Sequence, residues 1–128
     1  MSTLTEEQVN VLHHYKELLA SIKEGFEYIL ASFSDYSKTE GDVILIDVFA
    51  AFNQVILVNA DLQVLFEKDA HMVAAIEAFE EVVSAVEKMD GLFEKSQEKQ
   101  QVIQQTLYPA YKNWFDEIVP LLISKIQH

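Results

Sequence analysis

Apolar residues recur at alternating spacings of three and four along the first third of the chain. The stripe has eight members: Leu12, Tyr15, Leu19, Ile22, Phe26, Ile29, Phe33 and Tyr36. This spacing places them on one face of an α-helix. The preceding Thr3-Leu4-Thr5-Glu6 is typical of a capping box, in which the threonine hydroxyl and the glutamate carboxylate satisfy free backbone N–H groups. We therefore predict a helix from about residue 4 to about residue 35, ended by the turn-forming stretch SDYSKTEGD.

The most apolar stretch, DVILIDVFAAFNQVILVNADLQVLF, begins at residue 42. A membrane span needs about 20 predominantly apolar residues, and five polar residues interrupt this stretch: Asp47, Asn53, Gln54, Asn59 and Asp61. It is also too long without turn residues to be a strand. As a helix it carries one heptad stripe widened by a second: Ile44, Val48, Ala51, Val55, Val58, Leu62 and Leu65, with Leu45, Phe49, Phe52 and Ile56. We predict a central core helix over residues 42 to about 67, with a polar seam at Asp47, Gln54, Asp61 and Lys68.

A further helical stripe follows. Its members are Met72, Ala75, Phe79, Val82, Val86, Met89 and Phe93. Asp69 is placed to cap this helix, and Asp90-Gly91 is placed to stop it, because glycine favours the left-handed conformation just past a helix end. Since the stripe continues to Phe93, the sequence leaves open whether the helix runs on through Gly91.

The remainder, Leu92 to Ile126, is predicted to be a fourth helix that is polar at first and then aromatic. Pro109 and Pro120 should bend or break it, because proline lacks an amide donor and crowds the carbonyl four residues earlier. Four amphipathic helices with short connections predict an all-α fold: an antiparallel up-down-up-down four-helix bundle, its last helix kinked at Pro109 and Pro120. A length of 128 residues predicts one domain, spanning 1–128.

Composition narrows the classes of partner. Twenty-one acidic residues face nine basic ones, all of them lysine, which gives a formal net charge of −12. Nucleic-acid binding depends on cations that neutralise phosphates, so we expect no nucleic-acid partner. An anionic membrane surface would repel the chain as well, and we expect no membrane partner. The chain has no cysteine, and its N-terminus shows no basic patch followed by an apolar run, which together favour the cytoplasm.

Two pairs of residues have the i,i+4 spacing at which neighbours on a helix share a metal ion: His13 with Glu17, and Glu67 with His71. The Glu-x-x-His pairs of di-iron bundles do not occur in the sequence, and neither i,i+4 pair has a second ligand set. Ordinary contacts between neighbours on a helix surface explain both pairs. We expect no metal site and no cofactor.

His13 and Lys16 have the His-x-x-Lys spacing of histidine-phosphotransfer bundles. The resemblance stops at these two residues, because those domains follow the lysine with small residues, whereas here Glu17, Leu18 and Leu19 follow. A carboxylate beside the accepting imidazole would also repel the incoming phosphoryl group. The sequence has no Gly-x-Ser-x-Gly elbow, no phosphate-binding glycine loop and no cysteine nucleophile. We predict that the protein is not an enzyme.

The best candidate for a ligand pocket is a cluster of aromatic residues around Pro109: Tyr108, Tyr111, Trp114 and Phe115. Tyrosine hydroxyls would orient a ligand near the carbonyl that Pro109 leaves without its usual partner. The spacing of Tyr108, Tyr111 and Phe115 equally suits core packing, so both roles remain open.

A third apolar stripe lies on the helix predicted over residues 42 to about 67: Ile46, Ala50, Asn53, Leu57, Ala60 and Val64. It runs beside the polar seam, where a bundle helix normally meets water. Either this helix is wrapped on more sides than in a simple bundle, or the stripe meets another molecule. We predict partner binding by four of its members: Ile46, Ala50, Leu57 and Val64.

The predicted function is that of a small acidic, non-catalytic interaction protein, such as an adaptor or chaperone-like bundle. It would dimerise, most simply as a homodimer, or bind an amphipathic helix of a partner protein. The alternative is a phosphotransfer-type or small-ligand-binding helical bundle.

Overall fold

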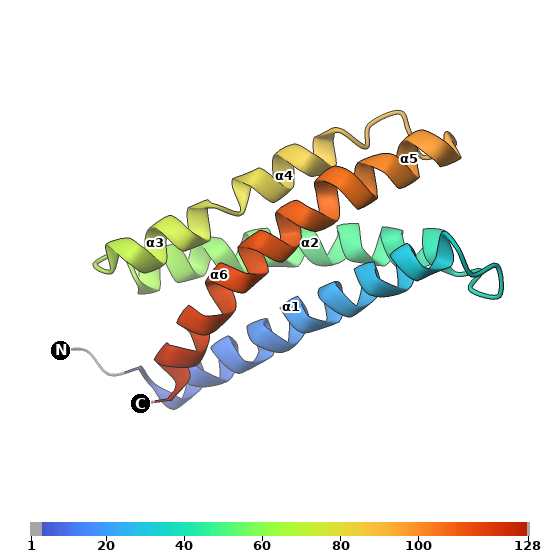
Figure 1. The fold of residues 1–128 in the computed structure, drawn as a ribbon. Helices are drawn as coiled ribbons and strands as arrows, with labels where there is room; N and C mark the ends of the chain where they lie inside the picture. The colour runs from blue at the N-terminus through green and yellow to red at the C-terminus, as the bar shows by residue number, and fades with distance from the viewer. Residues whose placement is uncertain (1–3, 128) are drawn as a thin grey trace.

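A computed structural model describes residues 4–127, and every regular element in this range is helical. The elements are α1 (Glu6–Ser32), α2 (Gly41–Leu65), α3 (Ala70–Glu77), α4 (Glu80–Glu87), α5 (Ser96–Val102), the π-helical turn η1 (Ile103–Leu107) and α6 (Tyr108–Ile126). These elements form four helical rods, which can be followed in Figure 1: α1, α2, α3 with α4, and α5 with η1 and α6. The prediction of an all-α fold with four helices is confirmed.

The start of α1 differs from the predicted capping box. Thr5 is the N-cap: its hydroxyl accepts a hydrogen bond from the Gln8 N–H at 3.1 Å, while the Gln8 side-chain oxygen accepts from the Thr5 N–H at 2.9 Å. Glu6 is the first helical residue, and Thr3 lies outside the described residues. The box is therefore shifted by two positions, because glutamine at the third helical position completes it as well as glutamate does.

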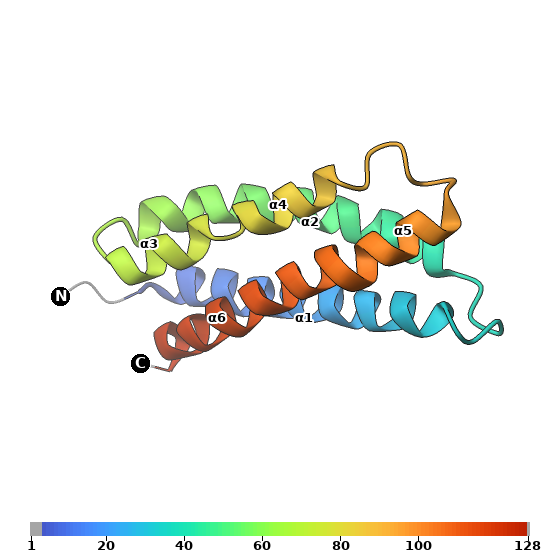
Figure 2. The same ribbon diagram turned by 45° about the horizontal axis from the view of Figure 1, so that its top comes forward.

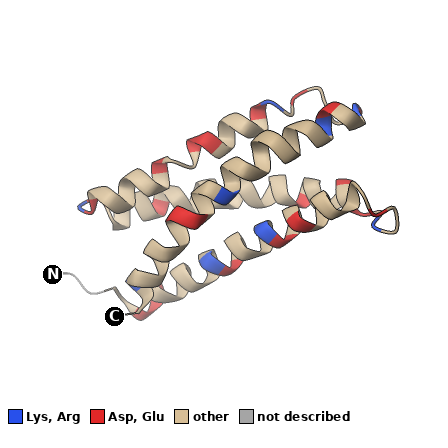
Figure 3. Ribbon diagram, in the orientation of Figure 1, with Lys and Arg blue, Asp and Glu red and all other residues tan. Residues whose placement is uncertain are grey.

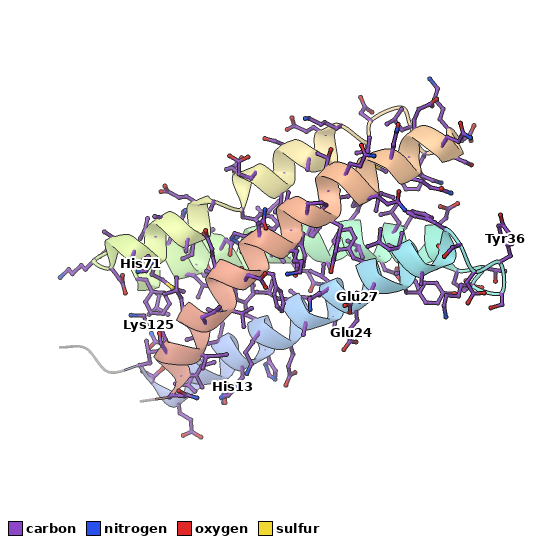
Figure 4. All side chains as sticks on the ribbon, in the orientation of Figure 1. His13, Glu24, Glu27, Tyr36, His71 and Lys125 are labelled. Carbon is purple, nitrogen blue, oxygen red and sulfur yellow. The ribbon has the colours of Figure 1, made fainter. Side chains whose placement is uncertain are left out.

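The end of α1 also corrects one expectation. The predicted apolar stripe included Tyr36, but α1 ends at Ser32 and Tyr36 lies in the following loop with 90% of its surface exposed. Figure 4 shows its side chain projecting away from the helices. Asp35 accepts hydrogen bonds from the backbone N–H and hydroxyl of Ser37, which closes a turn instead of another helical turn.

The bounds of α2 agree with the predicted core helix, and its buried face lies where the two stripes predicted to form the core meet. The buried residues are Leu45, Val48, Phe52, Val55, Asn59 and Leu62. Five of them belong to the two predicted core stripes, and Asn59 lies between these stripes. On this side α1 approaches α2 closely. A Cβ atom at Gly25 would stand 3.1 Å from a methyl carbon of Val48.

By length and composition alone, α2 is also able to cross a membrane. One 18-residue window has a mean hydropathy of 1.9, with 28% of its residues buried. The polar interruptions therefore do not by themselves disqualify it as a span. Against this stands the burial of one continuous face, including the polar residue Asn59, against the rest of the protein.

The third rod is broken, contrary to the prediction of one continuous helix. α3 ends at Glu77 and α4 begins at Glu80. The carbonyl of Ala75, which would accept from the Phe79 N–H in an unbroken helix, instead accepts from Trp114 Nε1 at 2.9 Å. The Phe79 N–H bonds to the Ile76 carbonyl, three residues back. A side chain from α6 thus explains the break.

The predicted cap and stop of this rod are both observed. The Asp69 carboxylate accepts a hydrogen bond from the Met72 N–H at 3.1 Å. Gly91 has a φ of +75°, beyond the end of α4 at Glu87, and so marks the stop. The helix does not run on through Gly91, and Phe93 lies in the connection to α5 rather than on a helical stripe.

The fourth rod accommodates both prolines without ending. The π-helical turn η1 lies immediately before Pro109, at the beginning of α6. Pro120 stands inside α6, which continues to Ile126. Neither proline therefore breaks the helix, and the π-helical turn takes up the irregular hydrogen bonding just before Pro109.

The rods enclose an aromatic core. α1 packs against α2 and α6, α6 also packs against α3 and α4, and α2 packs against α3. The ring of Tyr111 lies 5.5 Å from Phe26 and 5.8 Å from Phe52, and Trp114 lies 4.7 Å from Phe79 between ring centroids. The start of α1 and the end of α6 lie at one end of the molecule, as Figure 2 shows.

Candidate interaction surface on α2

One face of α2 is apolar and open to solvent. We call it the α2 face, and it consists of Val43, Ile46, Ala50, Asn53, Leu57, Ala60 and Val64. The largest exposed fractions are 57% for Ile46, 70% for Leu57 and 71% for Val64. The members alternate in steps of three and four residues, which aligns them along one side of the helix.

The α2 face lies on the side of α2 opposite its buried residues, and the third rod leaves a second side of α2 partly uncovered. α3 contacts both α2 and α6, whereas α4 packs mainly against α6 and η1. The break at Ala78 and Phe79 separates these two halves. α4 therefore does not close over α2, and a seam is left between them.

A groove lies in this seam. We call it the α2–α4 groove; it has a volume of about 290 Å³ and is lined by Phe49, Phe52, Asn53, Ile56, Phe79, Val82, Val83 and Val86. Asn53 belongs both to this lining and to the α2 face, so the two form one continuous surface. A shallower hollow of about 270 Å³ shares Phe49 and Val86 with the groove and extends it toward Asp90, Gly91 and Phe93.

Aromatic contacts position the side chains that line the groove. Phe52 and Phe79 meet edge to face on its floor, with ring centroids 5.8 Å apart. Phe93 meets Phe49 edge to face at 6.1 Å near one end. Lys99 holds Phe93 in place: its buried ammonium group donates to the Phe93 carbonyl at 2.9 Å and to an Asp42 carboxylate oxygen at 2.8 Å. These ring positions are set by contacts within the protein.

Acidic side chains flank the surface on both sides. On α2, Asp47 and Asp61 are exposed in the polar seam beside the α2 face. On α4, Glu80 and Glu87 are exposed next to groove residue Val83, at spacings of three and four. Figure 3 shows the acidic residues spaced along α4. An apolar strip between two acidic borders is the resulting pattern.

A family match covers the whole of this surface. Residues 10–117 match a family described as a domain of unknown function (DUF8042). The chain belongs to the DUF8042 family. The matched range includes all of α2, α3 and α4, and so contains the whole α2 face and the whole α2–α4 groove. No curated protein and no solved structure matches the chain.

The structure places all four predicted partner-binding residues of this DUF8042 chain on one surface. Ile46, Ala50, Leu57 and Val64 are all exposed on the α2 face. The sequence missed Val43, which precedes the stripe by three residues and is 54% exposed, and it missed the groove. The periodicity of α2 would have found Val43. Nothing in the spacing of Val83 and Val86 distinguishes a groove wall from a core position.

The predicted aromatic pocket is a packed part of the core. Tyr111 and Trp114 are buried, and each donates a hydrogen bond to a backbone carbonyl of another rod, Tyr111 to Leu19 at 2.7 Å and Trp114 to Ala75 at 2.9 Å. Tyr108 and Phe115 are partly buried and pack against the same core. None of the four lines the α2–α4 groove. The polar side-chain atoms of Tyr111 and Trp114 already have protein partners, which favours the packing role.

The histidines considered as metal ligands or phosphoryl acceptors lie on the surface. His13, His14 and His71 are all exposed, and Figure 4 shows His13 on α1 and His71 at the start of α3. Within residues 4–127, no three histidine, aspartate or glutamate side chains gather into a site that could hold a metal ion. Glu17, also exposed, lies one helical turn after His13.

Proposed function

We propose that this DUF8042 chain is a non-catalytic interaction protein that binds another protein through the α2 face and the α2–α4 groove. The single observation that carries this proposal is the exposure of the α2 face beside an apolar groove. A helix binds such a surface by placing side chains at i, i+3, i+4 and i+7 into it. The occupant is either a second copy of the chain or an amphipathic helix of a partner.

The apolar character of the surface supports this proposal. Single exposed apolar residues are ordinary, but contiguous exposed apolar patches mark interaction sites. Here the exposed members of α2 join the half-buried Val83 and Val86 of α4 through Ile56 and Asn53. Burying this strip would remove large aliphatic side chains from water, which is the main favourable contribution to protein association.

For the frame that carries the surface, we propose an antiparallel up-down-up-down four-helix bundle formed by residues 1–128 as one domain. The packing of α1 against α2 and α6, and of α6 against α3 and α4, supports this order. We also propose that the last helix is kinked at Pro109 and Pro120, supported by the π-helical turn before Pro109. Action in the cytoplasm belongs to the same proposal, on the grounds of the cysteine-free sequence.

A small apolar ligand is the second candidate occupant. The groove volume of about 290 Å³ is close to the lower end of small-molecule pockets, roughly 300–1,000 Å³. Phosphotransfer is less well supported, because the only observation in its favour is the exposure of His13 and His14.

Substitution of Leu57 tests the proposed function. Leu57→Glu should leave the fold intact, because the Leu57 side chain is 70% exposed and the new carboxylate would remain hydrated. Association should be lost, because a partner would then have to bury the charge. Light scattering measures the mass of wild type and variant, copurification measures partner binding, and circular dichroism measures the fold.

A matched control is Leu62→Glu, on the same helix but 1% exposed. An unpaired buried charge should lower the free energy of unfolding by about 3–5 kcal/mol. The proposal is contradicted if Leu57→Glu loses as much stability as Leu62→Glu. It is equally contradicted if Leu57→Glu keeps its fold and also keeps every association of the wild type.

A further inference from the structure

We infer that the occupant of the α2 face and the α2–α4 groove is a basic amphipathic helix of another protein, with an apolar stripe bordered by lysine or arginine. This inference rests on the proposed function and specifies its partner. It follows from the charged residues that border the surface. The apolar contacts alone would not distinguish a basic helix from an acidic one.

The acidic borders lie within reach of a helix seated on the surface. On α2, Asp47 and Asp61 each precede a member of the α2 face by three residues, Ala50 and Val64 respectively. Side chains three residues apart are neighbours on a helix surface. A helix that buries its apolar stripe on the α2 face would therefore bring its flanking residues beside these carboxylates.

The opposite border is also acidic. On α4, Glu80 and Glu87 flank groove residue Val83, and Asp90 lines the hollow that extends the groove. The basic residues near these borders are Lys68, which follows the end of α2, and Lys88, the C-cap of α4. Five acids thus face two lysines around the strip. Lysine or arginine on both flanks of the bound stripe would complement this pattern.

A second copy fits this surface less well. Two copies joined through their α2 faces would bring acidic borders together, on chains that each carry a net charge of −12. Like charges brought together at an interface disfavour association. An anionic lipid surface meets the same repulsion. A basic helix gains attraction from the same borders.

Two synthetic helical peptides test the inference on the full chain. Both carry leucine at i, i+3, i+4 and i+7; one has lysine on both flanks of this stripe, and the other has glutamate at the same positions. Fluorescence anisotropy of the labelled peptides measures their affinity for the protein. The lysine peptide should bind one to one and about tenfold more tightly or better, with the affinity falling as salt rises.

Charge-reversal variants locate the binding. Glu80→Lys with Glu87→Lys should weaken binding of the lysine peptide by about tenfold, because this variant reverses the charge of one border of the surface. The matched control is Glu24→Lys with Glu27→Lys, which makes the same change in net charge at exposed positions of α1 (Figure 4) and should weaken binding much less. Circular dichroism confirms that both variants are folded.

The other outcomes separate the inference from the proposed function. If both peptides bind equally and both lose binding in Leu57→Glu, the surface binds helices but charge does not select them, and only the inference fails. If neither peptide binds and the wild type is a dimer that Leu57→Glu dissociates, the occupant is a second copy, and again only the inference fails. If the lysine peptide binds Leu57→Glu as tightly as wild type, both fail. If the protein binds phosphatidylcholine vesicles but neither peptide, and Leu57→Glu abolishes the vesicle binding, both the inference and the proposed function fail.

Discussion

Asn59 brings a polar side chain onto the buried face of α2. Its Oδ1 accepts a hydrogen bond from the hydroxyl of Tyr15 on α1, and both residues are buried. Burial raises the pKa of the Tyr15 hydroxyl above its ordinary value near 10, so the phenol stays protonated and keeps donating. The pair fixes the register of α1 against α2, because a sliding helix would leave two buried polar groups without partners.

A double-mutant cycle tests this pair. Tyr15→Phe should lower the free energy of unfolding by about 1–3 kcal/mol, because the Asn59 oxygen would stay buried without a donor. Asn59→Leu should cost a similar amount by leaving the hydroxyl unpaired. Combining the two should recover part of the loss, since neither polar group then remains. Urea unfolding followed by circular dichroism gives each value.

Tyr36→Phe is the matched control for the same chemical change. Because Tyr36 is 90% exposed, this variant should have almost the same free energy of unfolding as the wild type. Strict additivity of Tyr15→Phe and Asn59→Leu would show that the hydrogen bond contributes nothing to stability.

At the scale of elements, the start of α3 joins a helix cap to an ion pair. Asp69 caps α3 through the Met72 N–H and also accepts a hydrogen bond from the Lys125 ammonium group of α6 at 2.6 Å. The Lys125 hydrogen bond, together with the Met72 N–H, holds the pKa of the Asp69 carboxyl below its ordinary value of 3.8. One carboxylate thus ties the third rod to the fourth.

Asp69→Ala should destabilise the protein by about 1 kcal/mol at neutral pH, the usual cost of losing a helix cap. Asp69→Asn keeps the cap and loses only the ion pair, so its loss should be smaller. The lowered folded pKa means that the carboxylate's contribution is complete above about pH 4 and fades as pH falls through the folded pKa. Urea unfolding at pH 7 and pH 3 measures this.

The difference between wild type and Asp69→Asn should therefore shrink at pH 3. A difference that stays constant between the two pH values would contradict the ionic part of this contribution.

At the scale of the whole molecule, the net charge of −12 opposes the compact state through self-repulsion. Raising sodium chloride from low concentration should screen this repulsion and raise the free energy of unfolding by roughly 1 kcal/mol, or about 4 °C in melting temperature. Thermal unfolding by circular dichroism measures the effect. The variant Glu24→Lys with Glu27→Lys is less acidic by four charges, so added salt should raise its melting temperature less. An equal gain in both proteins would point to a salt effect other than screening.

The sequence by itself determined the helices and most of their ends. The steps of three and four located every rod, because helical periodicity is a local property of the chain. Asp69 and Gly91 marked a start and a stop for the same reason. The sequence also identified Ile46, Ala50, Leu57 and Val64 as one surplus stripe, since α2 has more apolar residues than one buried face requires.

Only the tertiary structure decided which members of the two predicted core stripes of α2 are buried, and where the groove lies. Burial depends on the close approach of α1 at Gly25, and the break of the third rod depends on the hydrogen bond from Trp114 to the Ala75 carbonyl. That bond joins residues 39 positions apart. The pairing of Tyr15 with Asn59 spans 44 positions. Local spacing carries no information about such contacts, because they exist only once the rods have packed.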